Sequence, residues 1–142
     1  MKAYVIDTSV AVKWFGSYEG DAENALSLRR RLLAGDCTIT VPELLFYELA
    51  NALRHNPNFT VRDVKEALDS VFEMGLDVKR ADGFITSHAI DIAFRFGVTV
   101  YDAYFLALSH AEKKPFVTAD YKFMARMKGF KGMVNLSEIV SL

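Results

Sequence analysis

Four acidic side chains stand where a chain of alternating strands and helices would bring them together. Asp7 ends a short apolar run, and Asp102 and Asp120 each follow another such run. Glu48 lies on or beside the apolar stripe of an amphipathic segment, where a carboxylate is costly unless something compensates its charge. Carboxylates that lie close together repel one another without a counter-cation. Because the set contains no His or Cys, its oxygens suit Mg²⁺ or Mn²⁺ and the chemistry of phosphate esters.

Each acid also has an ordinary structural explanation. Aspartate is a favoured N-cap, and Asp7, Asp102 and Asp120 all precede segments that are expected to be helical. Glu48 could reach solvent along the edge of its helix. The shared site is favoured because all four acids are expected at one edge of the predicted sheet.

The elements that must position these acids alternate along the chain. Short apolar or β-branched runs predict strands, and amphipathic segments predict helices. Strands are expected at 3–6, 38–41, 98–101 and 116–118, with a further short strand at 76–78 and an edge strand at 133–136. Helices are expected at 10–15, 21–34, 42–55, 60–74, 84–96, 102–113 and 120–127. This alternation predicts right-handed crossovers and a parallel sheet with helices on both faces.

Local signals mark several boundaries of these elements. Thr60 and Asp63 have the spacing of a capping box, with Asp in place of the usual Glu. Gly97 is expected to end the helix before it. Pro42 is expected in the first turn of its helix, where a missing N–H costs nothing. Asp102 follows the strand expected at 98–101, so it is expected at the same edge of the sheet as the other acids. This edge, at the carboxyl ends of parallel strands, is where ligands bind.

Composition limits the class of protein. The chain has 142 residues, which predicts a single domain spanning 1–142. Its apolar fraction of 51% argues against disorder, and its one cysteine excludes an internal disulfide and a Cys-rich zinc site. A net charge of -1 argues against a wholly basic nucleic-acid binder. No apolar run is long enough for a membrane span or a signal peptide, so a cytoplasmic location without membrane attachment is expected.

Four fragments, in a fixed order, carry the most specific signal. They are Val5–Ser9 with Val12–Phe15, Pro42–Leu44 with Glu48–Leu53, Tyr101–Leu108, and Val117–Asp120. In this order and spacing the chain resembles the PIN-domain ribonucleases, and within them the VapC toxins of toxin–antitoxin pairs. The resemblance covers essentially the whole chain. It implies a three-layer α/β/α sandwich with a short parallel sheet, and cleavage of RNA that depends on Mg²⁺ or Mn²⁺.

The resemblance also implies that Asp7, Glu48, Asp102 and Asp120 form the catalytic, metal-binding site. Asp7 and Asp102 are the first choices for direct metal ligands. Glu48 and Asp120 are expected to hold waters of the ion, one of them placed for in-line attack. No His is expected near this edge, so none is expected to act as a general base.

Three polar residues match supporting positions of the family. Ser9 and Thr118 match places where a hydroxyl supports the metal or a carboxylate, and Asn51 matches a polar residue one helical turn after the site Glu. The family also uses the region around Trp14 and Phe46 as a groove for a C-terminal segment of the antitoxin. Phe15 or Phe46 is therefore expected to be exposed, and the resemblance favours a homodimer.

A basic stretch is the expected RNA-binding face. Between positions 113 and 131 there are six cations and one acid. The cations that follow Asp120 most closely in the sequence are Lys122, Arg126 and Lys128, which could contact the phosphodiester backbone. Such runs are more often solvated faces. A second candidate, less specific still, is the run 29–31.

Other functions remain to be weighed against a toxin. Haloacid-dehalogenase-type phosphatases need an Asp where this chain has Ser9, and response-regulator receivers need an acidic pair where Asp7 is followed by Thr8. A PIN-like RNA-processing nuclease without toxicity is left open. A PIN-like binding module with an inactive site is less favoured, since all four acids are present.

Overall fold

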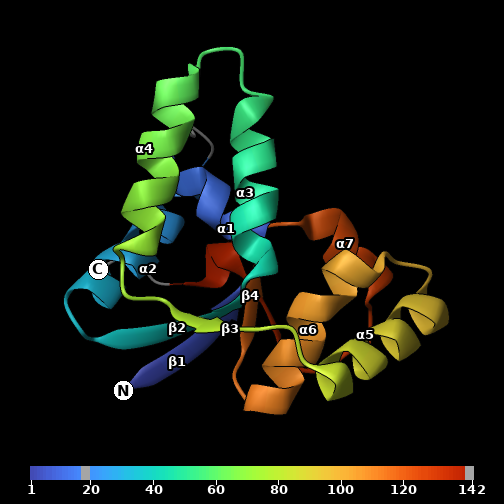
Figure 1. Cartoon of the computed structure of the whole chain (residues 1–142). Coiled ribbons are helices and arrows are strands. Elements are labelled where there is room, and N and C mark those ends of the chain that lie inside the picture. Colours follow the sequence, from blue (N-terminus) through green and yellow to red (C-terminus); the bar gives the residue numbers. More distant parts are fainter. Residues whose placement is uncertain (17–19, 140–142) are drawn as a thin grey trace.

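Five parallel strands form the centre of the computed structural model, which describes residues 1–16 and 20–139 (Figure 1). Their order across the sheet is β3-β2-β1-β4-β5. The strands are β1 (Lys2–Ile6), β2 (Cys37–Pro42), β3 (Asp77–Lys79), β4 (Phe116–Thr118) and β5 (Met133–Asn135). All four pairings between neighbouring strands are parallel, which confirms the predicted α/β fold and its parallel sheet.

The helices arrange themselves around this sheet. They are α1 (Thr8–Ala11), α2 (Ala22–Leu33), α3 (Leu44–Arg54), α4 (Val61–Phe72), α5 (Gly83–Phe96), α6 (Val100–Glu112) and α7 (Tyr121–Arg126), with 3-10 turns η1 (Val12–Trp14) and η2 (Leu136–Glu138). Helix α6 packs on β1, β2 and β4, and α5 packs on α6. Helices α3 and α4 pack against each other as a hairpin that projects away from the sheet (Figure 1).

The core explains why the central elements read as solid apolar runs. Val5 and Ile6 of β1 and Phe116 of β4 are fully buried, as strands covered on both faces should be. Helix α6 buries Phe105 and Leu106 among its many apolar side chains. A helix that is apolar nearly all round fits its place between the sheet and α5.

One predicted strand is wrong. Residues 98–101 do not form a strand, because α6 begins at Val100. Thr99 is its N-cap, and the Thr99 side chain accepts a hydrogen bond from the Asp102 backbone N–H at 3.1 Å. Asp102 therefore lies in the first turn of a helix and not at the end of a strand.

The role predicted for Pro42 is also wrong. Pro42 is the last residue of β2, in register with Lys79 of β3, and α3 begins at Leu44. A proline is tolerated there because the end of a strand can forgo one ladder hydrogen bond. The next residue resumes the bonding, since the Glu43 N–H donates to the Lys79 carbonyl at 3.0 Å.

Two other predicted boundaries are confirmed. Thr60 and Asp63 form both hydrogen bonds of a capping box at the start of α4. Gly97 ends α5 with a φ of 66°, in the left-handed region that favours glycine. The helix expected at 10–15 starts earlier, at Thr8, and continues as η1. No helix within the described ranges is long and apolar enough to cross a membrane.

Candidate functional site

Asp7 lies at the carboxyl end of β1, held by two hydroxyl groups. Oδ1 accepts hydrogen bonds from the Ser9 N–H at 3.1 Å and the Ser9 hydroxyl at 2.5 Å. Oδ2 accepts from the Thr118 hydroxyl at 2.6 Å. Burial raises the pKa of Asp7 to about 6, although these hydroxyls favour the charged form and oppose the rise. Both hydroxyl positions predicted as supports thus contact the carboxylate.

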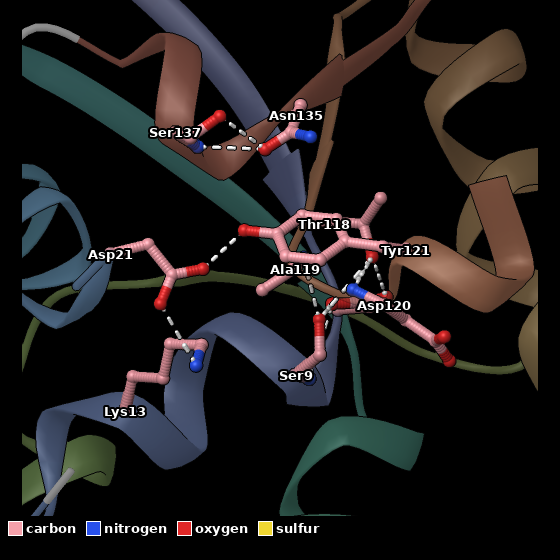
Figure 2. Close-up of polar contacts among 10 residues, drawn as sticks. Ser9, Lys13, Asp21, Thr118, Ala119, Asp120, Tyr121, Asn135 and Ser137 are labelled. Atoms are coloured by element: carbon pink, nitrogen blue, oxygen red, sulfur yellow. Dashed lines mark hydrogen bonds and ion pairs between the residues drawn. The ribbon is translucent and has the colours of Figure 1, made fainter. Parts of the chain in front are cut away.

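The same hydroxyl groups attach the segment after β4 to the segment after β1. Ser9 Oγ accepts from the Ala119 N–H at 2.8 Å, and Thr118 Oγ1 accepts from the Asp120 N–H at 3.0 Å. Asp120 in turn caps α7, its Oδ1 accepting from the Phe123 N–H at 3.0 Å. Figure 2 shows Ser9, Thr118, Ala119 and Asp120 gathered in this arrangement. Asp120 is therefore both the N-cap of α7 and one of the four predicted site acids.

Glu48 of α3 reaches this edge through Thr8, for which the sequence predicts no role. The Thr8 hydroxyl donates to Glu48 Oε1 at 2.7 Å. Burial raises the pKa of Glu48, the hydrogen bond from Thr8 opposes that rise, and the charge of Asp102 adds to it. The only signal for Thr8 was its place between Asp7 and Ser9.

Repulsion links all four predicted acids. Burial raises the pKa of Asp102, the hydrogen bond with Thr99 lowers it, and the charge of Asp120 raises it again. Asp120 also raises the pKa of Asp7, and Asp102 raises that of Glu48. Each acid is thus close enough to a neighbour for like charge to matter, in the order Asp7, Asp120, Asp102, Glu48. The four acids come from the end of β1, from α3, from α6 and from the N-cap of α7, and each lies near at least one other of the set.

Two of the predicted RNA-binding cations share an open cavity with two of these acids. The cavity measures about 490 Å³ and is lined by Asp102 and Asp120, and by Lys122 and Arg126 of α7. Arg126 also donates to the Gly97 carbonyl at 3.1 Å. Lys128 is exposed and lies outside this lining.

The rest of the basic stretch lies elsewhere. Lys113 and Lys131 line a separate cavity at the amino ends of β4 and β5, the opposite edge of the parallel sheet. Lys114 donates to the Thr40 hydroxyl at 2.8 Å, a contact inside the fold. The stretch 113–131 is therefore not one continuous RNA-binding face. In the second basic run, 29–31, Arg30 forms an ion pair with Glu23 at 2.6 Å.

The remaining predicted positions lie outside the acidic cluster. Asn51 is exposed and lines a groove between α3 and α4. Phe46 is buried and its ring stacks on Phe72 at 4.3 Å, so the expected exposure of Phe46 is wrong. The neighbouring Tyr47 is exposed instead, and Phe15 is half-buried.

The donor set fits a hard divalent cation. All the converging donors are carboxylate oxygens, and their mutual repulsion is what a cation would relieve. Within the described part of the chain, no group of three or more Asp, Glu, His or Cys side chains is arranged so that it could hold a metal ion. Mg²⁺ does not need one, because it keeps several waters and is held by one or two carboxylates.

Comparisons with known proteins show the family and the fold of the chain. A family model described as PIN domain matches residues 4–129. No curated protein matches the chain. Among solved structures, a toxin–antitoxin complex from Klebsiella pneumoniae has a TM-score of 0.70 at 14% identity, covering 94% of this chain and 97% of that one.

Two further solved structures have similar folds. VapBC2 from Rickettsia felis, bound to a DNA fragment from its promoter, has a TM-score of 0.66 at 19% identity, covering 94% of this chain and 98% of that one. VapC20 from Mycobacterium tuberculosis, described as a toxin that cleaves the sarcin–ricin loop, has a TM-score of 0.65 at 14% identity and 98% coverage of both chains.

Proposed function

Because this chain belongs to the PIN-domain family of nucleases, we propose that it is a Mg²⁺- or Mn²⁺-dependent endoribonuclease and the toxin of a toxin–antitoxin pair. The observation that carries the proposal is the cluster of four acids linked by repulsion beside an open cavity with two cations. Acids alone would repel an RNA backbone. Acids that hold a dication, with lysine and arginine beside them, would attract it.

The side chains divide the work of phosphodiester cleavage between them. Asp7 and Asp102 would hold the ion, which when bound polarises the phosphate and lowers the pKa of a coordinated water. Glu48 and Asp120, next to them in the cluster, would hold water in line with the bond to be broken. Ser9 and Thr118 orient Asp7, because their hydroxyls donate to both of its oxygens.

Lys122 and Arg126 would position the substrate. Both line the cavity that contains Asp102 and Asp120, so they can contact phosphates on either side of the scissile one. Lys128, exposed one residue after α7 and its C-cap, would extend this contact along the strand. These contacts fix the position of the RNA and carry no base specificity by themselves.

We propose that this chain binds a segment of a cognate antitoxin. We also propose that it forms a homodimer and that it acts in the cytoplasm. The groove between α3 and α4 is the observation that supports an antitoxin partner. It is lined by apolar side chains that include the exposed Tyr47 and Val61, with Arg54 and Lys65 beside them. Such a surface suits an amphipathic segment that carries acidic residues.

A charge substitution tests the catalytic proposal. Asp7→Asn keeps the size of the side chain and an oxygen that can still cap α1, but it removes the charge that would hold a dication. RNA cleavage in Mg²⁺ or Mn²⁺ should be abolished while circular dichroism shows an intact fold. The matched control is Asp69→Asn, on the exposed face of α4, which should cut at the wild-type rate. A folded Asp7→Asn protein that cuts RNA at the wild-type rate would contradict the nuclease assignment of this site.

Co-expression with the protein encoded immediately upstream tests the partner. A toxin should elute with that protein as one complex in size-exclusion chromatography, and its nuclease activity should fall. An active nuclease that elutes alone, and that does not slow growth when expressed, would instead be an RNA-processing enzyme. A chain that binds the partner but cuts no RNA under any of these conditions would be a binding module.

A further inference from the structure

A nearly buried ion pair lies beside the acidic cluster, and no role described so far uses it. Lys13 Nζ of η1 lies 3.1 Å from Asp21 Oδ1, just before α2, and their side chains are only 9% and 11% exposed. The Tyr121 hydroxyl donates to the other oxygen, Asp21 Oδ2. Figure 2 shows Asp21 joined by one carboxylate oxygen to Lys13 and by the other to Tyr121.

These three side chains join the segment that follows Asp7 to the segment that follows Asp120. Lys13 lies in η1, which directly continues α1. Tyr121 is the first residue of α7 and follows Asp120. Asp120 is thus held on one side by its N–H bond to Thr118 and on the other by the tyrosine next to it.

Helix α7 needs such attachments. It has six residues, and a helix this short is not stable by itself. Its core attachment is Phe123, which is buried and packs edge-on against the ring of Phe116. Phe123 fixes the depth of the helix against the sheet, and the Tyr121 hydroxyl fixes the position of its first turn.

Stability alone is a poor explanation for the ion pair. Removing two charges from water costs free energy that their attraction often fails to recover, so an apolar pair of similar size is commonly as stable. Burial by itself would raise the pKa of Asp21, yet the Tyr121 hydrogen bond and the Lys13 charge keep the pKa below its ordinary value. Asp21 is therefore held as an anion, which is the form that accepts a strong bond from tyrosine.

We propose that Lys13, Asp21 and Tyr121 are positioning residues that fix Asp120 relative to Asp7 and so set the affinity of the site for its divalent ion. This inference rests on the proposed function. Polar partners behind the ligands of a metal commonly change its affinity tenfold or more when they are lost. Because Tyr121 acts through the backbone next to Asp120, the low end of that range applies.

The test compares two tyrosines that flank site acids. Tyr121→Phe removes the hydroxyl that bonds to Asp21. Tyr101→Phe is the matched control, since Tyr101 precedes Asp102 in the first turn of α6 and its hydroxyl makes no hydrogen bond within the described ranges. Mn²⁺ binding, followed by the electron paramagnetic resonance signal of free Mn²⁺, should be about tenfold weaker in Tyr121→Phe and unchanged in Tyr101→Phe. RNA cleavage by Tyr121→Phe should need about tenfold more Mn²⁺ and recover its rate at saturation.

A second variant separates positioning from stability. The double variant Lys13→Met, Asp21→Leu replaces the ion pair with apolar side chains of similar size. It should keep the thermal midpoint of the metal-free protein and lose Mn²⁺ affinity to the same extent as Tyr121→Phe. A lower midpoint with unchanged Mn²⁺ affinity would show a purely structural pair and overturn the proposal.

The two proposals fail in different ways. Unchanged Mn²⁺ affinity in a Tyr121→Phe protein that still cuts RNA would overturn the positioning role alone. A wild-type chain that binds Mn²⁺ and cuts no RNA would contradict the nuclease, while a tenfold loss of Mn²⁺ affinity in Tyr121→Phe would still support positioning.

Discussion

Asp7 combines two opposed influences on one carboxylate. Its burial favours the protonated form, while the hydroxyls of Ser9 and Thr118 favour the charged form. The net result is a pKa of about 6, so near neutral pH the group is mostly ionised, at a cost in free energy. A dication at this carboxylate would offset that cost. We therefore expect the site to bind a dication in the absence of RNA.

The raised pKa of Asp7 predicts a dependence of stability on pH. The folded Asp7, with a pKa of about 6, binds its proton more tightly than an unfolded Asp with the ordinary value of 3.8. The free energy of unfolding of the metal-free protein should therefore fall as pH rises from about 4 to about 6. Asp7→Asn removes this loss. At pH 7.5 in EDTA it should be about 1–2 kcal/mol more stable than wild type, and at pH 4 it should show no such gain.

Urea unfolding at the two pH values measures the difference. Added Mn²⁺ should reverse the order at pH 7.5, because only the wild type gains from binding it. Asp69→Asn, on the exposed face of α4, is the control, and its free energy of unfolding should equal that of the wild type in every buffer. Equal stability of Asp7→Asn and wild type at pH 7.5 would mean that the Asp7 charge costs nothing in the folded protein.

Thr8 predicts a change in the pH profile of cleavage. Its hydroxyl donates to Glu48 and opposes the rise in the pKa of that carboxyl caused by burial. Thr8→Val keeps the shape and removes the donor, so the pKa of Glu48 should rise further. The acidic limb of the profile of kcat/KM against pH should then move to higher pH. Thr8→Ser keeps the hydroxyl and should leave that limb in place.

The sequence predicted some of these residues and missed others for a physical reason. Ser9 and Thr118 follow the family pattern, and both contact Asp7 as expected. Thr8 bonds to a residue 40 positions away, and a threonine at a helix start looks like any other first-turn residue. Nothing local in the chain marks its partner.

At the scale of elements, α6 shows how a cap can outweigh a strand propensity. The β-branched residues Val98, Thr99 and Val100 favour a strand. Thr99 and Asp102 have the same Thr-x-x-Asp spacing as Thr60 and Asp63, and a helix begins at both places. The spacing alone predicts the helix start at Thr60, whereas at Thr99 it competes with the strand propensity of the β-branched residues. The consequence is chemical, because the N-terminus of a helix favours the negative charge of Asp102.

Two caps of the same kind supply a paired prediction. Thr99→Ala and Thr60→Ala each remove a side-chain acceptor at an N-cap, so each should lower the free energy of unfolding by about 1 kcal/mol. Only Thr99→Ala loosens the turn that carries Asp102. It alone should weaken Mn²⁺ binding, measured by calorimetry on both proteins. An equal loss of Mn²⁺ affinity in the two variants would show that general stability, and not the placement of Asp102, sets the affinity.

For the whole molecule, the parallel sheet gives its two edges different chemistry. The carboxyl edge carries the acidic cluster with Lys122 and Arg126, and the amino edge carries Lys113 and Lys131. The alternation of strands and helices was enough to predict the sheet. It was not enough to divide the basic stretch, because the stretch is continuous in sequence while β4 and β5 separate its parts in space.

This division predicts which cations contact RNA. In the Asp7→Asn background, where the RNA stays intact, Lys122→Ala should weaken RNA binding and reduce the slope of log affinity against log salt by about one. Lys131→Ala, at the opposite edge, removes the same charge and should leave the slope unchanged. Fluorescence anisotropy across a series of KCl concentrations gives both slopes. A matching fall in the two variants would mean that RNA responds to net charge and not to this cavity.

The place of β1 in the centre of the sheet has a consequence for synthesis. β1 pairs on one side with β2, which soon follows it in the chain, and on the other with β4, which begins only at Phe116. A ribosome releases the chain from its N-terminus, so Asp7 emerges long before Thr118 and Asp120. Until β4 docks, Asp7 has neither its second hydroxyl nor its acidic neighbour. If the proposed function is right, the site is complete only after β4 has emerged and paired with β1, so a nascent chain that lacks β4 is expected not to cleave RNA.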